Sequence, residues 1–178
     1  MTATHEAPGS EPALDTALFR HVLGHFCTGV VVVAAVAPEG PVGLTCQSFC
    51  SLSLDPPLVM FGAARTSTSW PRIRRVGSFC VNVLAEDQQE VSTRMARSGA
   101  DKFAGVDWDP TPPGAVRLRG ALAWLDCELH AEHPGGDHTV VVGRVRRPAV
   151  ASGAPPLLYH RGGYAALNSG RPQKLRPA

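Results

Sequence analysis

Residues 43–54 constrain the fold most, because their side chains alternate as a β-strand requires and no charged residue interrupts them. A strand face in water usually carries Lys, Glu or Arg, whereas hydroxyls, an amide and glycine suit a surface that hydrogen-bonds a ligand or a second subunit. On periodicity alone, an ordinary half-buried strand remains the alternative. The apolar face comprises Leu44, Cys46, Cys50, Leu52 and Leu54, interrupted by Ser48, and the polar face comprises Gly43, Thr45, Gln47, Phe49, Ser51 and Ser53.

The next apolar segment, residues 58–63, follows after only Asp55-Pro56-Pro57, which suits a short antiparallel connection and leaves no room for a helical crossover. The patterns predict a closed antiparallel barrel of six or seven strands with helices at its margins. Residues 100–114, which hold three prolines, are expected to form a loop. Further strands are predicted at residues 30–37, 78–84, 121–132, 139–145 and 157–160, and helices at 15–29, 69–76 and 87–97.

The composition indicates one domain, expected at residues 14–168, between a disordered leader at residues 1–13 and a flexible tail at residues 169–178. The formal net charge of +2 does not call for a nucleic-acid partner. Five cysteines without a CxxC pair argue against a disulfide framework and a zinc ribbon. No apolar run is long enough to cross a bilayer, so we expect a cytoplasmic protein without membrane association.

Common nucleotide-binding and hydrolytic motifs are absent, including GxGxxG, GxxxxGK[ST] and GxSxG. His21 and His25 lie four residues apart on the first predicted helix, but no third metal ligand is suggested and both lie away from its apolar stripe. We interpret them as surface residues and expect no metal site. The stripe consists of Leu18, Phe19, Val22, Leu23 and Phe26.

Two segments carry candidate binding groups. Ser67, Thr68 and Ser69 follow Arg65 at the predicted start of a helix, where they suit either plain helix capping or the binding of a phosphate. His138 lies at the mouth of a predicted strand pair, where an imidazole can stack on or hydrogen-bond a flat heterocycle. Near the C-terminus, Tyr159, Arg161 and Tyr164 suit either a ligand or a solvated terminal strand.

Taken together, several short motifs resemble the flavin reductase family, which has a flavin-binding split barrel and supplies two-component flavin monooxygenases. The resemblance covers residues 15–167, and Cys46, Gln47 and Met95 depart from the residues that many relatives carry. In order, the motifs are Phe19-Arg20, Cys27-Thr-Gly-Val30, Gly43-Leu-Thr-Cys-Gln-Ser-Phe49, Ser53-Leu-Asp-Pro-Pro-Leu58, Ser78-Phe-Cys-Val-Asn-Val-Leu84, Asp101-Lys-Phe103, Gly136-Asp-His138 and Pro156-Leu-Leu-Tyr159.

The resemblance implies a mainly β fold, an antiparallel six-stranded Greek-key split β-barrel with a few peripheral helices, which forms a homodimer. It implies that FMN or FAD is the flavin, NADH or NADPH the hydride donor, and a separate flavin-dependent monooxygenase the recipient. Its implied cofactor-binding residues are Thr45, Cys46, Gln47, Ser48 and Ala63 at the ring, Ser67, Thr68, Ser69, Arg94 and Lys102 at the ribityl phosphate, and His138, Tyr159, Arg161 and Tyr164 at the nicotinamide nucleotide.

Direct hydride transfer from nicotinamide to flavin needs no side-chain nucleophile, which agrees with the lack of a catalytic dyad. We therefore expect His138 to position the nicotinamide. The alternative is a non-catalytic flavin- or haem-binding protein on the same barrel, since a fold does not fix a function. A nucleic-acid binder using the arginines of residues 144–147 is disfavoured because no aromatic residues accompany them.

Overall fold

A computed structural model of the protein describes residues 14–99, 101–112, 114–151 and 153–167. The expected leader and tail lie outside these residues, and the domain limits stay a prediction. The helices are α1 (Thr16–Leu23), α2 (Trp70–Val76), the 3-10 turn η1 (Glu86–Gln88) and α3 (Gln89–Ala96). The strands are β1 (Thr28–Gly29), β2 (Val31–Ala37), β3 (Gly40–Cys46), β4 (Cys50–Leu54), β5 (Pro57–Ala64), β6 (Ser78–Val83), β7 (Trp108–Thr111), β8 (Ala115–Leu118), β9 (Ala123–Gly135), β10 (His138–Val150), β11 (Leu158–His160) and β12 (Gly163–Ala165).

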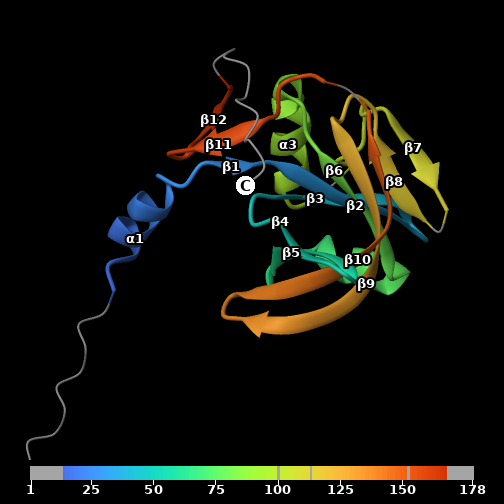
Figure 1. Ribbon diagram of the computed structural model, residues 1–178, viewed down its shortest axis with the longest axis horizontal. Coiled ribbons are helices and arrows are strands. Elements are labelled where there is room, and N and C mark those ends of the chain that lie inside the picture. Colours follow the sequence, from blue (N-terminus) through green and yellow to red (C-terminus); the bar gives the residue numbers. More distant parts are fainter. Residues whose placement is uncertain (1–13, 100, 113, 152, 168–178) are drawn as a thin grey trace, which may run out of the picture.

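Six antiparallel strands follow one another around the barrel in the order β3, β2, β6, β9, β10 and β5. The two outer strands of this path, β3 and β5, meet through side chains near Cys46 and Gly62, so the barrel is split at this seam. Figure 1 shows the curved sheet with α3 beside it. The predicted mainly β split barrel is confirmed, although the large sheet has nine strands because β4, β7 and β8 extend it.

The core has two layers because β2 is buried on both faces, which explains its continuous apolar sequence. Val31 and Val33 pack with Trp70 and Ile73 of α2 in one hydrophobic cluster. On the opposite face, Val32 packs in a second cluster. That cluster also contains Met95 of α3, Phe103 and Leu157. Both α2 and α3 are thereby fixed to the barrel at the level of the seam.

The expected single strand at residues 43–54 is wrong in one respect, because the chain leaves the sheet between Cys46 and Cys50. Leu44 and Cys46 are buried as predicted, whereas Cys50 and Leu52 are exposed. The exposed strand β4 pairs only with β5, at the edge of the sheet. The alternation of apolar and polar residues runs on through this break in the strand, so periodicity alone does not show where β3 ends.

The first helix also differs from its prediction. Asp15 caps it as expected through bonds to the N–H groups of Ala17 and Leu18, but the helix ends at Gly24 rather than at Gly29. The five residues of its predicted apolar stripe are exposed in the single chain, and Phe26, which follows the end of the helix, is 76% exposed. Helix α1 projects away from the barrel in Figure 1.

Four strand segments were not predicted, β1, β7, β8 and β12. The expected loop at residues 100–114 contains β7, which pairs with β8. After the predicted strand β11, the chain turns at Arg161 and Gly162 and returns as β12, while β1 pairs with the other side of β11. This small sheet lies outside the barrel, next to α1 (Figure 1). Within the described ranges, no helix combines the length and apolar character needed to span a membrane.

Candidate functional site

A cavity of about 210 Å³ lies beside the seam of the split barrel. Its walls come from β3, β5, the start of α2, the end of α3 and the tip of the β9–β10 hairpin. Seven of the fourteen predicted cofactor-binding residues line it: Thr45, Ala63, Ser67, Thr68, Ser69, Lys102 and His138. We refer to this cavity as the seam pocket.

The seam itself is closed by side chains instead of a strand ladder. The Ser48 hydroxyl oxygen accepts the backbone N–H of Gly62 over 2.8 Å and lies 3.1 Å from the Cys46 sulfur. A β-carbon at Gly62 would lie 3.1 Å from the Ser48 oxygen and 3.5 Å from the His138 ring. Glycine therefore permits both side chains to approach β5. Sequence reasoning missed Gly62, although an isolated glycine in a strand pattern signals a close approach.

Cys46 is the thiol nearest to the candidate ring site. Burial raises its pKa, and the hydrogen bond from the neighbouring Ser48 opposes that effect only in part. The group is therefore a protonated thiol at neutral pH, which suits packing and not nucleophilic attack. Gln47, also predicted at the ring, is exposed and does not line the seam pocket.

The hydroxyls before α2 are oriented by the N–H groups that they accept. The Ser67 oxygen accepts the backbone N–H of Trp70, the first residue of α2, over 3.1 Å, whereas Ser69 at the N-cap position makes no side-chain capping bond. The buried Ser69 oxygen accepts an N–H of Lys102 over 2.9 Å. Because each oxygen is engaged as an acceptor, its own O–H remains available to donate to a ligand oxygen in the seam pocket.

Lys102 joins three walls of the site. Its ammonium donates to the Gly43 carbonyl over 3.1 Å, to the Met95 carbonyl over 3.0 Å and to the Ser69 hydroxyl. These contacts use all three donors of the ammonium group. Burial lowers the pKa of Lys102, and the positive charge of Arg72 lowers it further. Lys102 thus supplies positive charge near the pocket while it orients Ser69.

His138 is the first residue of β10 and pairs with Ala64 of β5. Its Nδ1 atom lies 2.7 Å from a carboxylate oxygen of Asp137, and the hydrogen bond with His138 lowers the pKa of the Asp137 carboxyl group. The carboxylate favours a hydrogen on Nδ1, which leaves Nε2 to face another group. Sequence reasoning assigned Asp137 no role in binding, although its position next to His138 was visible.

The remaining predicted residues lie outside the seam pocket. Arg94 donates to Glu90 and to the carbonyl of Ala104. The Tyr164 hydroxyl donates to Ser92 over 2.9 Å, and Ser92 in turn accepts the Thr45 hydroxyl at its carbonyl over 2.6 Å. Tyr164 therefore braces the wall that carries Thr45.

Tyr159 packs edge to face against Tyr164, with ring centroids 5.5 Å apart. Arg161 is exposed at the turn between β11 and β12. Neither side chain lines the seam pocket, and their expected contact with a nicotinamide nucleotide stays a prediction.

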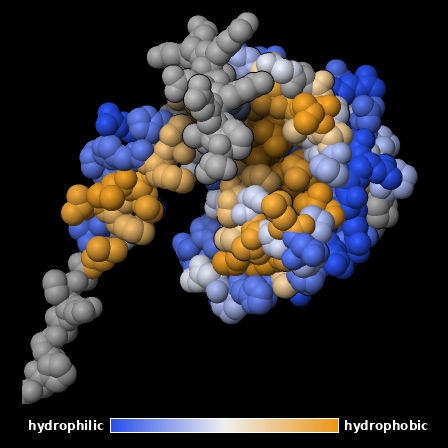
Figure 2. Space-filling model, in the orientation of Figure 1, coloured by the Kyte–Doolittle hydropathy of each residue, from blue (hydrophilic) through white to orange (hydrophobic). Residues whose placement is uncertain are grey.

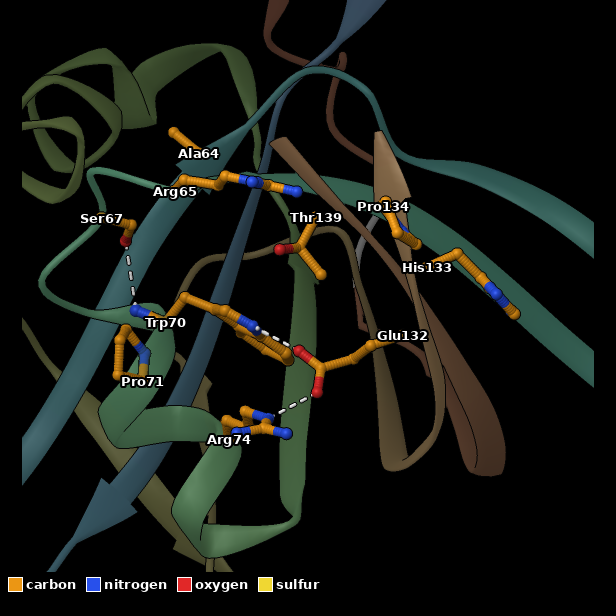
Figure 3. Close-up of a pocket in the computed structure, with 10 residues that line it drawn as sticks. All are labelled: Ala64, Arg65, Ser67, Trp70, Pro71, Arg74, Glu132, His133, Pro134 and Thr139. Carbon is orange, nitrogen blue, oxygen red and sulfur yellow. Dashed lines mark hydrogen bonds and ion pairs between the residues drawn. The ribbon is translucent and has the colours of Figure 1, made fainter. Parts of the chain in front are cut away.

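A second cavity, of about 440 Å³, opens between α2 and the hairpin on the other side of the segment from Ala64 to Ser67 (Figure 3). Glu132 lies at its centre, where it accepts the indole N–H of Trp70 over 2.9 Å and pairs with Arg74. These groups satisfy one another, so they join α2 to β9. Arg65 also lines this cavity, and its side chain extends toward Thr139 in Figure 3.

The site is thus a hydroxyl-lined pocket at the seam of a split antiparallel barrel, in a sequence without a nucleotide-binding glycine motif. Residues 23–168 match the family model described as "Flavin reductase like domain". The chain belongs to this flavin reductase family.

Similar proteins agree with this assignment. The reductase subunit HsaB of a flavin-dependent monooxygenase from Rhodococcus jostii is 48% identical over 166 residues, covering 93% of this chain and 84% of the relative. The NADH-dependent FMN reductase SmoA of Agrobacterium fabrum is 41% identical, covering 90% of each chain. The crystal structure of an NADH:FAD oxidoreductase from Streptomyces globisporus, in complex with NAD and FAD fragments, has a TM-score of 0.82 at 33% identity, covering 88% of this chain and 95% of that one.

Proposed function

We propose that this protein is an NAD(P)H:flavin oxidoreductase that reduces FMN or FAD and supplies the reduced flavin to a separate flavin-dependent monooxygenase. One observation carries the proposal: the seam pocket brings the hydroxyls of Ser67, Thr68 and Ser69 together with His138 on the scaffold of the flavin reductase family. Relatives named as FMN reductase and as monooxygenase reductase subunit support both halves of the function.

The flavin ring is proposed to lie along the end of β3. Thr45, Ser48 and the backbone at Cys46 and Gln47 are its neighbours on one side, and Ala63 of β5 is its neighbour on the other. The absence of ionised side chains from this stretch suits a neutral planar ring that needs hydrogen bonds and close approach. The two carbonyls that Lys102 holds, those of Gly43 and Met95, keep β3 and α3 at a fixed separation around the ring.

The ribityl phosphate is proposed to bind at the three hydroxyls before α2. Ser69 directs its O–H outward because Lys102 occupies its oxygen, and the ammonium supplies charge without direct contact. Arg94 pairs with Glu90, so its support of the phosphate is indirect, through the end of α3. The seam pocket therefore has donors suited to a phosphate dianion.

Bound flavin accepts a hydride directly from a reduced nicotinamide, which requires orientation of the two rings and no nucleophile. His138 is proposed to orient the nicotinamide, because it lines the seam pocket from the hairpin side and Asp137 holds its ring. The reaction is then accelerated by alignment, with Asp137 acting through His138 as a positioning residue.

We propose that the protein is a homodimer whose interface includes α1. The helix has an apolar side that includes Leu18 and Val22, each 58% exposed, and Phe26 just after the helix is exposed as well, with no covering partner among the described residues. Apolar side chains gather on the projecting helix in Figure 2. Sedimentation velocity should report a dimer, and Val22→Glu should shift it toward monomer. A wild-type monomer at micromolar concentration would refute the proposal.

All five cysteines are free thiols, which supports the proposal of a reducing, cytoplasmic location. The experiment that tests the function mixes purified protein with NADH or NADPH and with FMN or FAD, and follows the nicotinamide absorbance. Oxidation that depends on added flavin is expected. Flavin binding without oxidation by either donor would instead establish a non-catalytic binding protein.

A further inference from the structure

A third cavity, of about 440 Å³, adjoins the seam pocket. The two share Thr68, Ser69 and Lys102 in their linings, so a ligand held at these hydroxyls lies next to both cavities. We call this space the side cavity. Its own walls include Glu39, Pro41, Arg72 and Phe103.

The side cavity carries cationic donors. Arg72 donates through Nε to Glu39 over 3.2 Å, and its two terminal nitrogens have no hydrogen-bond partner among the residues that the structure describes. Its charge lies near enough to Lys102 to lower the pKa of that ammonium. Arg72 and Lys102 therefore supply positive charge to the side cavity, whose lining also includes the carboxylates of Glu39 and Asp101.

Polar and apolar groups for a nucleoside are also present. Glu39 accepts both Arg72 and Arg75 at one oxygen, Oε1, and its side chain is 46% exposed. A carboxylate that remains accessible in this way is a suitable acceptor for the hydroxyls of a ribose. Pro41 and Phe103 provide apolar surface on which a base can pack.

We propose that the side cavity binds the adenylate half of FAD, and that Arg72 and Glu39 thereby determine a preference for FAD over FMN. This inference rests on the proposed function, which places the flavin phosphate at Thr68 and Ser69. The second phosphate of FAD is joined to the first through one bridging oxygen, so it lies next to these hydroxyls. Arg72 follows Ser69 by three residues, about one helical turn, and brings its free guanidinium nitrogens to that side.

The test compares the dissociation constants of FAD and FMN by isothermal titration calorimetry for the wild type and for Arg72→Ala. We expect FAD affinity to fall about tenfold in the variant, the size of a lost charge-assisted contact, while FMN affinity is unchanged. Arg74→Ala is the matched control, because Arg74 lies on the same helix but pairs with Glu132 at another cavity. It should leave the ratio of the two affinities unchanged.

A second variant, Glu39→Gln, keeps the shape of the side chain and removes the carboxylate that accepts the ribose hydroxyls. It should also weaken FAD selectively, and thermal unfolding without flavin checks that both variants remain folded. Equal loss of FAD and FMN affinity, no loss of either, or a raised KM for NADH with unchanged FAD affinity would each overturn the inference. Failure of the wild type to bind either flavin would instead refute the proposed function.

Discussion

The ammonium of Lys102 donates to the hydroxyl oxygen of Ser69 over 2.9 Å, which joins the loop after α3 to the residue that precedes α2. The side chain of Lys102 also holds carbonyls of β3 and α3. Lys102, in the Asp101-Lys-Phe103 motif, therefore organises the proposed phosphate site indirectly, because it orients the Ser69 hydroxyl.

Lys102→Met should preserve the length of the side chain and remove all three hydrogen bonds. We expect flavin affinity to fall about tenfold or more, since hydrogen bonds to charged groups contribute about 1.5 to 3 kcal/mol each. Fluorescence titration of FMN and FAD measures the effect. Ser69→Ala should reproduce much of the loss, and a double variant should lose less than the sum of the two single variants, because both remove the same contact. Full additivity would contradict the coupling.

Gly62→Ala should weaken flavin binding about fivefold. The new methyl group would lie only 3.1 Å from the Ser48 oxygen, so it should displace that oxygen and disturb its hydrogen bond with the Gly62 N–H. Gly29→Ala is the matched control, since a β-carbon there meets no atom within 4 Å. Flavin affinity is read by fluorescence quenching. Equal losses of flavin affinity in the two variants would show that flavin binding does not depend on the space beside Gly62.

His138→Ala should raise the KM for NAD(P)H or lower turnover, with flavin affinity nearly unchanged, because the imidazole is proposed to orient the nicotinamide. Asp137→Asn should produce a weaker effect of the same kind by releasing Nδ1 of His138. Steady-state kinetics with varied nicotinamide nucleotide measure both. Unchanged kinetics in the His138 variant would remove this residue from the site.

Cysteine labelling should separate the thiols by burial and pKa. Burial raises the pKa of Cys46, and it raises that of Cys127 to about 12, so Cys127 remains a protonated thiol when the buffer is moved from about pH 7 to about pH 9. Iodoacetamide should modify exposed Cys27 and Cys50 first. Mass spectrometry of tryptic peptides gives the order, and early modification of Cys127 would contradict the packing.

Asp126→Ala should destabilise the fold by about 3 kcal/mol, because it leaves a half-buried arginine without its charge partner. The Asp126 carboxylate accepts Arg117 and the Thr111 hydroxyl, and it fixes β7 and β8 against β9. Urea unfolding measures the change. Asp109→Ala, which breaks an exposed pair with Arg119, serves as the control and should have little effect.

Local signals predicted much of the barrel. The buried strand β2, the helix α2 with its left-handed Gly77 cap, and the β9–β10 hairpin follow from apolar periodicity and from glycine and proline positions. Strand β7 escaped prediction because Pro110 argued for a loop. Its pairing depends on β8, and an edge strand tolerates a proline that a central strand does not.

The sequence predicted the parts of the site that depend on the chemistry of single side chains. It did not predict the parts that depend on how closely two distant strands approach each other. Hydroxyls in Thr45 and in Ser67 to Ser69, the ammonium of Lys102 and the imidazole of His138 do line one cavity. The break after Cys46 and the role of Gly62 depend on how two distant strands approach. No pattern along a single segment records that distance, so the sequence alone indicated one continuous strand.

The two-residue turn of the long β9–β10 hairpin has a consequence for how such a reductase diversifies. Gly136 and Asp137 connect the strands, and His138 follows at once, so the proposed nicotinamide contact sits at the end of a ribbon. The hydroxyls proposed for the flavin come from separate segments, before α2 and along β3. A change at the hairpin tip can therefore alter how the nicotinamide ring is oriented while the hydroxyls proposed for the flavin stay in place.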